Sequence, residues 1–314
     1  MAKLIHLSDL HFGAHDEDLV AAVEQRVDEE NPDLVVISGD FTQRARTEQF
    51  EEACAFLGRL RDNGHDVLGV PGNHDIPLYD VLRRFLSPLT RYRRYIDNTL
   101  CPFIDMPEVT VLGLNTARSL TFKDGHISHE QIAYIRDSFA RTDPGKPRLL
   151  VMHHPLFALP VGEGPELGKA MGDSQRALDT IAELGVDLVL AGHNHRASVH
   201  HAEDLVHGAG STLVVQAGTA TSTRLRDEEQ SFNRIEFEPN VVRVTIQRWK
   251  EGEFRSGDSE IFHRTGDQWR KQSGAKVEEA EEAANRSLGR RSSRKRYGRD
   301  PRFRSRRLRP AHPG

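Results

Sequence analysis

Cysteine is scarce in this sequence, and long apolar runs are absent from it. Cys54 and Cys101 are the only cysteines in 314 residues, so the chain has neither a disulfide framework nor a Cys-x-x-Cys pair for a structural zinc ion. The apolar start after Lys3 is shorter than the core of a signal peptide, and no later stretch approaches the ~18 apolar residues of a membrane span. These absences predict a soluble protein of a reducing compartment, the cytoplasm.

Charge is distributed unevenly along the chain, whose formal net charge is −4. Residues 285–314 contain 12 Lys and Arg but a single acidic residue, Asp300, and the remaining 31 basic and 46 acidic residues give −15. We therefore divide the chain into a domain at 1–265 and a polar, Arg-rich arm at 266–314 that is disordered in part. Such an arm is suited to contact nucleic acid or an anionic membrane, or to fold back onto the acidic domain.

Short apolar runs alternate with amphipathic segments over the first two thirds of the chain, as in βαβ units that build a buried sheet. The predicted strands are Lys3–Ser8, Leu34–Ser38, Val67–Val70, Val109–Leu114, Leu149–Met152 and Val186–Ala191, and the predicted helices are Asp18–Glu29, Glu48–Asp62, Leu78–Phe85, His129–Phe139 and Ser174–Leu184. From about Ser211, strands follow one another without helices and predict an antiparallel second sheet or second half of a sandwich: Leu213–Ala217, Asn233–Glu238, Val241–Trp249 and Glu253–Phe262.

Five of the predicted strands are followed by side chains of the kinds that bind metals. Ligands of open α/β sheets bind beyond the carboxyl ends of strands, so we expect these side chains to converge on one crevice. Carboxylates, carboxamides and imidazoles suit Mn, Fe, Zn or Co. The count of ligands fits two divalent ions bridged by both oxygens of Asp40, the other ligands being Asp9, His11 and His195 for one ion and Asn73, His153 and His193 for the other. Gly39, Gly72 and Gly192 are expected to turn the backbone sharply at strand ends.

Two such ions clamp a phosphoryl group and activate a water as hydroxide, which predicts hydrolysis of phosphate esters. His74 adjoins Asn73, and adjacent side chains diverge, so we expect His74 to face the substrate as a hydrogen-bond donor. Asn115 ends a strand at the same edge and is expected either to cap its loop or to contact substrate. His154 is expected to pack beside His153. Residues 78–97, which are rich in arginine, form either a surface helix pair or a lid over the site.

The five motifs, in this order and at these spacings, resemble the calcineurin-like metallophosphoesterase superfamily over about residues 3–220. This resemblance implies an α/β/β/α sandwich of two mixed sheets with a dinuclear metal site at the C-terminal edge of the strands, and it assigns metal roles to the same seven residues. Gln43 stands where the related Ser/Thr protein phosphatases have the Asp that supports their catalytic His, and Asp75 replaces their Glu. The motifs are more similar to bacterial class III cyclic-nucleotide phosphodiesterases and their glycerophosphodiesterase relatives.

The sequence therefore predicts a metal-dependent phosphodiesterase that acts on cyclic nucleotides or small phosphodiesters. One alternative is a nuclease or a UDP-lipid pyrophosphohydrolase that uses the same site, with the arm holding nucleic acid or an anionic membrane. The other is a metal-binding scaffold with a basic recruiting tail, against which the complete set of ligands argues. Nothing in the sequence indicates the oligomeric state.

Overall fold

The structure is a computed structural model that describes residues 1–121, 123–159, 170–171, 174–224 and 228–272. Its strands are β1 (Ala2–Leu7), β2 (Leu34–Ile37), β3 (Val67–Gly69), β4 (Phe103–Asp105), β5 (Thr110–Leu114), β6 (Arg148–Met152), β7 (Leu188–Ala191), β8 (Ser198–His201), β9 (Leu213–Gln216), β10 (Ser231–Glu238), β11 (Val241–Lys250), β12 (Glu253–Thr265) and β13 (Gln268–Lys271). Its helices are α1 (Glu17–Glu30), α2 (Thr47–Asp62), α3 (Val81–Leu86), α4 (Thr90–Tyr95), α5 (His129–Phe139), α6 (Gln175–Glu183) and α7 (Ala202–Leu205), with a 3₁₀-helix at Asn73–Asp75.

Local sequence explains where several of these elements begin and why they are buried. The Asp16 carboxylate caps α1 by accepting hydrogen bonds from two backbone amides of its first turn. Ser128 and Gln131 form the capping box predicted for α5, each side chain bonding to the other residue's amide. β2 and β7 are short apolar runs in which every residue is buried, as expected of strands covered on both faces.

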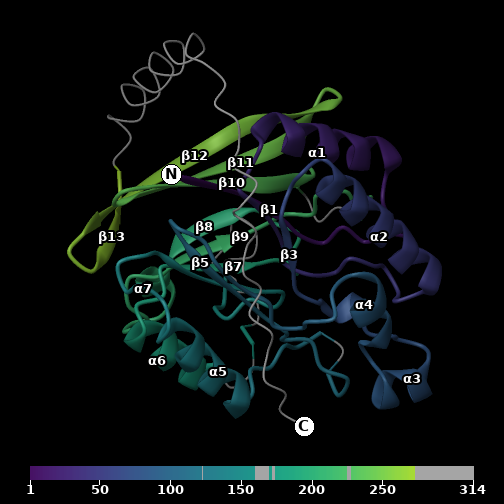
Figure 1. The fold of residues 1–314 in the computed structure, drawn as a ribbon, viewed down its shortest axis with the longest axis horizontal. Helices are drawn as coiled ribbons and strands as arrows, with labels where there is room; N and C mark the ends of the chain where they lie inside the picture. The colour runs from purple at the N-terminus through teal and green to yellow at the C-terminus, as the bar shows by residue number, and fades with distance from the viewer. Residues whose placement is uncertain (122, 160–169, 172–173, 225–227, 273–314) are drawn as a thin grey trace.

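Two mixed sheets pack face to face (Figure 1). The seven-stranded sheet has the order β13-β12-β11-β10-β1-β2-β3, in which β1, β2 and β3 are parallel and the other strands antiparallel to their neighbours. The six-stranded sheet has the order β4-β5-β6-β7-β9-β8, with four parallel strands and an antiparallel strand at each edge.

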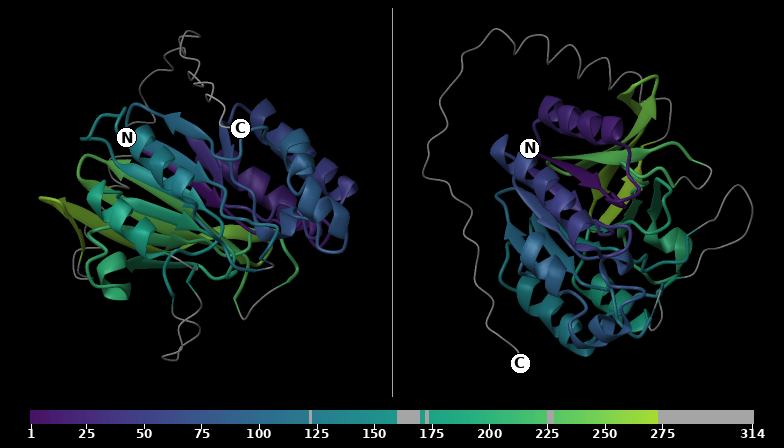
Figure 2. Two further views of the ribbon diagram at one scale, coloured as in Figure 1. Left: turned by 90° about the horizontal axis from the view of Figure 1, so that it is seen from below. Right: turned by 90° about the vertical axis from the view of Figure 1, so that its right-hand side faces the viewer.

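Helices cover the outer face of each sheet, so that the molecule has four layers (Figure 2). One apolar core lies under α1 and α2 and includes Phe50 and Phe56. A second core fills the space between the sheets and includes Val36 and Leu190, and a third lies under α5 and α6. This arrangement confirms the predicted α/β/β/α sandwich of two mixed sheets.

The structure departs from the sequence prediction in how the later strands pair. β9 was expected among the antiparallel strands, but it lies parallel to β7 in the six-stranded sheet. β10, β11 and β12 extend the sheet that contains β1, so they do not form a sheet of their own. The predicted arm begins with an unforeseen strand, β13, in which Trp269 is buried and donates a 2.9 Å hydrogen bond to Asp187. The arm from 273 onward lies outside the described residues.

The segment at 78–97 divides into two short helices with different environments. α4 packs against α2, and its Tyr92 is buried in the core. Three arginines of this segment, Arg84, Arg91 and Arg93, donate hydrogen bonds to backbone carbonyl groups. A lid function for the segment stays a prediction. Within the described residues, no helix is both long and apolar enough to cross a membrane.

Candidate metal centre

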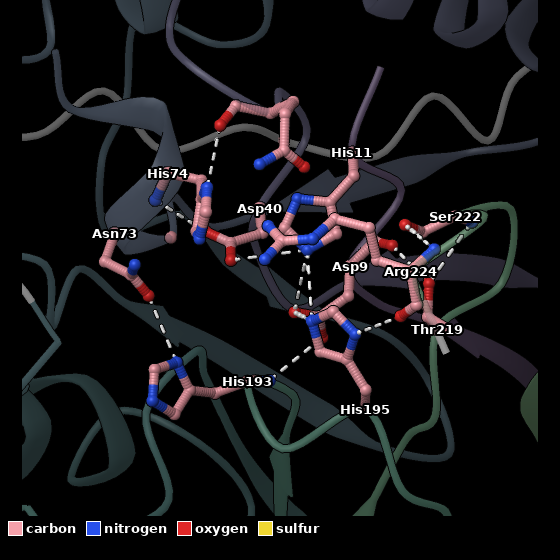
Figure 3. A network of polar contacts seen from close by, with 12 residues as sticks. Asp9, His11, Asp40, Asn73, His74, His193, His195, Thr219, Ser222 and Arg224 are labelled. Carbon is pink, nitrogen blue, oxygen red and sulfur yellow. Dashed lines mark hydrogen bonds and ion pairs between the residues drawn. The ribbon is translucent and has the colours of Figure 1, made fainter. Parts of the chain in front are cut away.

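The seven residues predicted as metal ligands come together at the carboxyl ends of five strands, although they are spread over almost the whole domain. Figure 3 shows six of them pointing toward one another. They follow the strands β1, β2, β3, β6 and β7, and the parallel strands of both sheets end at this edge. The seven are Asp9 and His11 after β1, Asp40 after β2, Asn73 after β3, His153 after β6, and His193 and His195 after β7.

Asp9, His11 and His195 form the first of two groups of ligand atoms. The Nε2 atoms of the two histidines lie 3.1 Å apart. Asp9 Oδ1 lies 3.2 Å from His195 Nε2 and 3.7 Å from His11 Nε2. Three atoms of metal-binding type thus face one small space.

Asn73, His153 and His193 form the second group. The carboxamide oxygen of Asn73 lies 3.1 Å from both His153 Nε2 and His193 Nδ1. The two histidine nitrogens are themselves 3.2 Å apart. Each of the two predicted sets of ligands is thus gathered in one place, and the sets adjoin, since ligand atoms of Asp9 and His153 lie within 4.8 Å of each other.

Asp40 lies between the two groups. Its Oδ2 atom is 3.8 Å from His11 Nε2 in the first group and 3.3 Å from His153 Nε2 in the second. Its Oδ1 atom accepts a 2.8 Å hydrogen bond from the backbone amide of His74. The sequence prediction used both oxygens as a bridge, whereas in the structure Oδ2 alone faces both groups.

The cluster suits divalent cations in its burial, in its unsatisfied atoms and in its donor types. Asp9, His11 and His153 are fully buried, and within the described residues Asp9 Oδ1 has no hydrogen-bond partner. An acceptor buried without a donor is costly unless a cation approaches it. Several sets of three His and Asp side chains here have ligand atoms within 4.8 Å of one another. Imidazole, carboxylate and carboxamide donors without thiolate suit Mn, Fe, Zn or Co.

Burial and close contacts shift the pKa values in the cluster. Burial opposes ionisation of Asp9 and Asp40, but His195 beside Asp9 and His153 beside Asp40 outweigh it and hold both pKa values below their usual range. Burial lowers the pKa of His11 to about 4, which keeps that ring neutral, the form that binds metals. At neutral pH the cluster therefore offers two carboxylates and at least one neutral imidazole.

The backbone is tightly turned where it carries these side chains. Five predicted ligands have a left-handed backbone with φ between 50° and 74°: Asp9, His11, Asp40, His193 and His195. Residues other than glycine adopt this conformation at a cost and keep it where the surrounding structure imposes it, which is frequent at functional sites.

Of the three glycines expected to turn the backbone, Gly39 does so with φ of 100°. Gly72 has φ of −103°, and Gly192 is not left-handed either. These two are glycines because of close approach, since a Cβ at Gly72 would overlap the Asp40 carboxylate and one at Gly192 would lie 2.6 Å from Asp9 Oδ2. The turning is done instead by the predicted ligands themselves.

His74 lies at the edge of the cluster, with its ring 4.8 Å from that of His11. Its Nδ1 atom is 2.7 Å from the backbone carbonyl oxygen of Gln43, so this nitrogen carries a proton and donates it. In the sequence, Gln43 stands out because it replaces the supporting Asp of the Ser/Thr protein phosphatases. Its carbonyl group nevertheless orients His74, a role that no side-chain pattern reveals.

Asp75 joins the loop that carries Asp40 to the loop that carries Asn73, and the sequence prediction missed this role. Its carboxylate accepts hydrogen bonds from the backbone amides of Phe41, Thr42 and Gly72, and from the Thr42 hydroxyl. Burial and the charge of Asp40 raise the pKa of Asp75 to about 7, against the effect of these donors. Its place next to His74 in the motif was the available signal.

Two further predicted positions lie outside the two groups. Asn115 follows β5 at the same edge, and its side-chain oxygen accepts a 3.0 Å hydrogen bond from the Ala117 amide, which caps the loop. Asn115 also lines a cavity together with Leu89 and Leu100. Its contact with substrate stays a prediction. His154 is buried against Thr116, whose hydroxyl lies 2.8 Å from His154 Nδ1. Its Nε2 has no hydrogen-bond partner within the described residues.

Comparison with known protein families and curated sequences gives consistent results. A model of the calcineurin-like phosphoesterase family matches residues 2–197. The glycerophosphodiester phosphodiesterase GpdQ of Enterobacter lignolyticus is 26% identical over 209 residues, which cover 62% of this chain and 72% of that protein. A probable cyclic nucleotide phosphodiesterase of a Synechococcus strain is 25% identical over 256 residues, which cover 76% of this chain and 88% of that protein.

Solved structures share the fold at low sequence identity. The purple acid phosphatase PPD1 from seeds of yellow lupin (Lupinus luteus) superposes with a TM-score of 0.62 at 14% identity, over 87% of this chain and 57% of the lupin chain. A dimetal phosphatase from Danio rerio gives a TM-score of 0.57 at 15% identity, over 81% of this chain and 98% of its own. At such identities the likeness concerns the fold alone.

Proposed function

Because the chain belongs to the calcineurin-like phosphoesterase family, we propose that it is a metal-dependent phosphodiesterase that hydrolyses cyclic nucleotides or other small phosphodiesters. The observation that carries this proposal is the pair of ligand groups that share Asp40 Oδ2. Asp9, His11 and His195 would hold one divalent ion, and Asn73, His153 and His193 the other. Such ions would supply positive charge to phosphoryl oxygens and would lower the pKa of a water molecule.

Residues around the two groups orient the ligands in this proposal. His153 Nδ1 donates a 2.8 Å hydrogen bond to the Ser38 carbonyl oxygen, which leaves Nε2 free to face Asp40 and Asn73. His195 Nδ1 lies 3.2 Å from the Arg224 carbonyl oxygen, so its Nε2 is the nitrogen that faces Asp9 (Figure 3). Backbone carbonyl groups thus select the tautomers that metal binding needs.

His74 takes the role of hydrogen-bond donor to the substrate. Since Nδ1 already donates to the Gln43 carbonyl, Nε2 has a proton to give only while the ring carries both protons. In that state His74 would stabilise a phosphoryl oxygen or protonate the leaving oxygen.

The substrate class rests on two observations. The curated relatives that match carry the names of a glycerophosphodiester phosphodiesterase and of probable cyclic nucleotide phosphodiesterases. The residue at the position of the phosphatases' supporting Asp is Gln43, whose side-chain Oε1 has no partner within the described residues. We therefore propose phosphodiesters, and not phosphoproteins, as the substrates. The proposed ions are Mn, Fe, Zn or Co, and the proposed location is the cytoplasm.

The test is hydrolysis of bis-p-nitrophenyl phosphate by protein loaded with Mn²⁺. We expect turnover in the wild type and its loss in His153→Ala and His195→Ala. His207→Ala is the matched control, because that side chain is fully exposed and lies 3.6 Å from Glu203. The wild-type protein is then tested on a panel of cyclic nucleotides, glycerophosphodiesters, UDP-lipid analogues and single-stranded DNA. An enzymatic role would be contradicted if the wild type bound metal but cleaved neither bis-p-nitrophenyl phosphate nor any member of this panel.

A further inference from the structure

Helix α3 has the opposite polarity from that of an ordinary surface helix. Its apolar residues Val81, Leu82, Phe85 and Leu86 are 53–75% exposed, whereas Arg84 on the other side is only 3% exposed. A helix on a soluble domain normally buries its apolar side and exposes its charges. The exposed face of α3 is therefore suited to bind an apolar partner surface.

Hydrogen bonds of Arg84 hold α3 in this orientation. Its guanidinium group donates to three backbone carbonyl oxygens, those of Pro77, Ser119 and Thr121, at 2.7–3.0 Å. These bonds tie the helix to the loop after β5, more than 30 residues along the chain. Rotation of α3 to bury its apolar side chains would break all three hydrogen bonds. The contacts of Arg84 therefore keep these apolar side chains exposed.

The apolar surface extends beyond the helix. Leu78 and Tyr79 are also exposed, and together with the four residues of α3 they form what we name the α3 patch. Leu120 is 84% exposed and lies between Ser119 and Thr121, whose carbonyl groups accept hydrogen bonds from Arg84. Within the described residues, Met1 is the only large apolar side chain that is exposed elsewhere. A largely apolar cavity of about 390 Å³, lined by Leu89, Leu100 and Ala117 among others, lies next to the end of α3.

Positive charge surrounds the α3 patch, although the domain as a whole is acidic. Residues 76–99 and 117–124 carry seven Lys and Arg against three Asp. Arg84 among them is buried, and Arg83 lies 3.6 Å from Asp80. Arg44 donates a 2.7 Å hydrogen bond to the Tyr79 hydroxyl and lies over its ring. Arg83 is partly exposed beside Leu82, and Arg93 and Arg118 line the neighbouring cavity. Exposed apolar side chains with a cationic rim match the interface of an anionic bilayer.

We propose that the α3 patch docks the protein onto an anionic lipid bilayer. Charge decides between this partner and a second copy of the chain, because a two-fold contact through the patch would bring together two surfaces that carry the same net positive charge. Arg44 bonds to Tyr79, and the carbonyl group of the adjacent Gln43 holds His74, so residues 43 and 44 connect the patch to the candidate metal centre. The inference does not depend on the proposed reaction, since binding to a membrane is measured without turnover.

The test is co-sedimentation of the full chain with vesicles of about three parts phosphatidylcholine to one part phosphatidylglycerol. We expect the wild type to bind these vesicles more tightly than vesicles of phosphatidylcholine alone. The variant Leu82→Ser/Phe85→Ser should bind at least about tenfold more weakly, because it removes the two apolar side chains at the centre of the exposed helix. Both positions are exposed, so its thermal midpoint should match that of the wild type.

The exchange variant Leu82→Phe/Phe85→Leu is the matched control, since it keeps the composition of the patch and should keep the binding. The Arg-rich arm is present in all three proteins, so a difference among them reports the patch. Equal binding by Leu82→Ser/Phe85→Ser and the wild type would assign vesicle binding to the arm and overturn the proposal. The proposal also fails if the wild type does not bind, or if it is a dimer that the serine variant splits in the absence of lipid.

Discussion

The Nδ1 atom of His74 donates a 2.7 Å hydrogen bond to the backbone carbonyl oxygen of Gln43. A main-chain group thus orients the predicted catalytic imidazole, at the position where the related Ser/Thr protein phosphatases, from whose motifs this chain departs, have a supporting Asp. The amide of the same His74 donates to Asp40 Oδ1 at 2.8 Å, so His74 is connected to the side chain that lies between the two ligand groups.

This relationship predicts different effects of neighbouring substitutions. His74→Ala should retain its metal but lower kcat by ~10²–10⁴, the usual contribution of a positioned acid or base. The loss should be smaller for p-nitrophenyl esters, whose leaving group needs less protonation. Gln43→Ala should remain close to wild type, because the carbonyl that holds His74 is kept. Elemental analysis checks the metal, and a His74→Ala protein that had lost an ion would make His74 a ligand.

Asp40→Asn should abolish activity and release at least one ion. Asp40 Oδ2 faces both ligand groups, and a carboxamide brings no charge to offset two cations. The protein should still fold, because the carboxamide oxygen of Asn can accept the hydrogen bond that Asp40 accepts from the His74 amide. Metal content and circular dichroism measure the two effects. Full metal content with normal turnover in this variant would refute a shared carboxylate.

Asp75→Asn should lower stability by about 2 kcal/mol, because the carboxamide has one acceptor oxygen fewer and turns its own donors toward buried amides. We also expect weaker retention of metal, since the loops of Asp40 and Asn73 lose their link. Thr42→Ser is the control, because it keeps the hydroxyl that bonds to Asp75 and to the Ala45 amide and leaves the three amides bonded to Asp75. Urea unfolding of both variants makes the comparison, and equal stabilities would contradict the role assigned to Asp75.

Glu30 provides a prediction about pH. Its buried carboxylate contacts Arg26, Arg234 and Lys3 at 2.7–3.2 Å. Burial alone would raise the pKa of Glu30, but Arg234, Lys3 and Arg26 outweigh it and lower the pKa below the ordinary 4.5. A lowered pKa means that the charged form stabilises the fold above about pH 4.5 and that this contribution is lost as the pH falls through the folded-state pKa.

Glu30→Gln should therefore cost about 2 kcal/mol of unfolding free energy at neutral pH, because Lys3, Arg26 and Arg234 lose the carboxylate that they share. Arg26 keeps its ion pair with Glu29, and Arg234 keeps its ion pair with Glu236. The difference from wild type should shrink as the pH falls below about 4.5. Denaturant titrations of both proteins over this range measure it. A difference that stays constant with pH would show that packing, and not charge, makes Glu30 important.

The sequence by itself predicted most of the elements and the residues of the candidate site, although it did not reveal β13. Apolar runs such as Leu34–Ile37 and the capping box at Ser128 are local signals, read within a few residues. The ligand candidates were found because each follows directly on a buried strand, and parallel strands end at a common edge. Such positions depend on the order of residues along the chain, so a sequence displays them.

Only the tertiary structure decided which strands pair and which polar atoms meet. β9 joins β7 rather than β10, and Trp269 in β13 bonds to Asp187, a contact across 82 residues. Backbone carbonyl groups hold two side chains of this structure: that of Gln43 holds His74, and those of Pro77, Ser119 and Thr121 hold Arg84. The pattern of side chains does not indicate these contacts, because every residue has the same backbone carbonyl group. Periodicity reports which side of a helix is apolar, whereas the contacts of Arg84 with a distant loop decide which side of α3 faces outward.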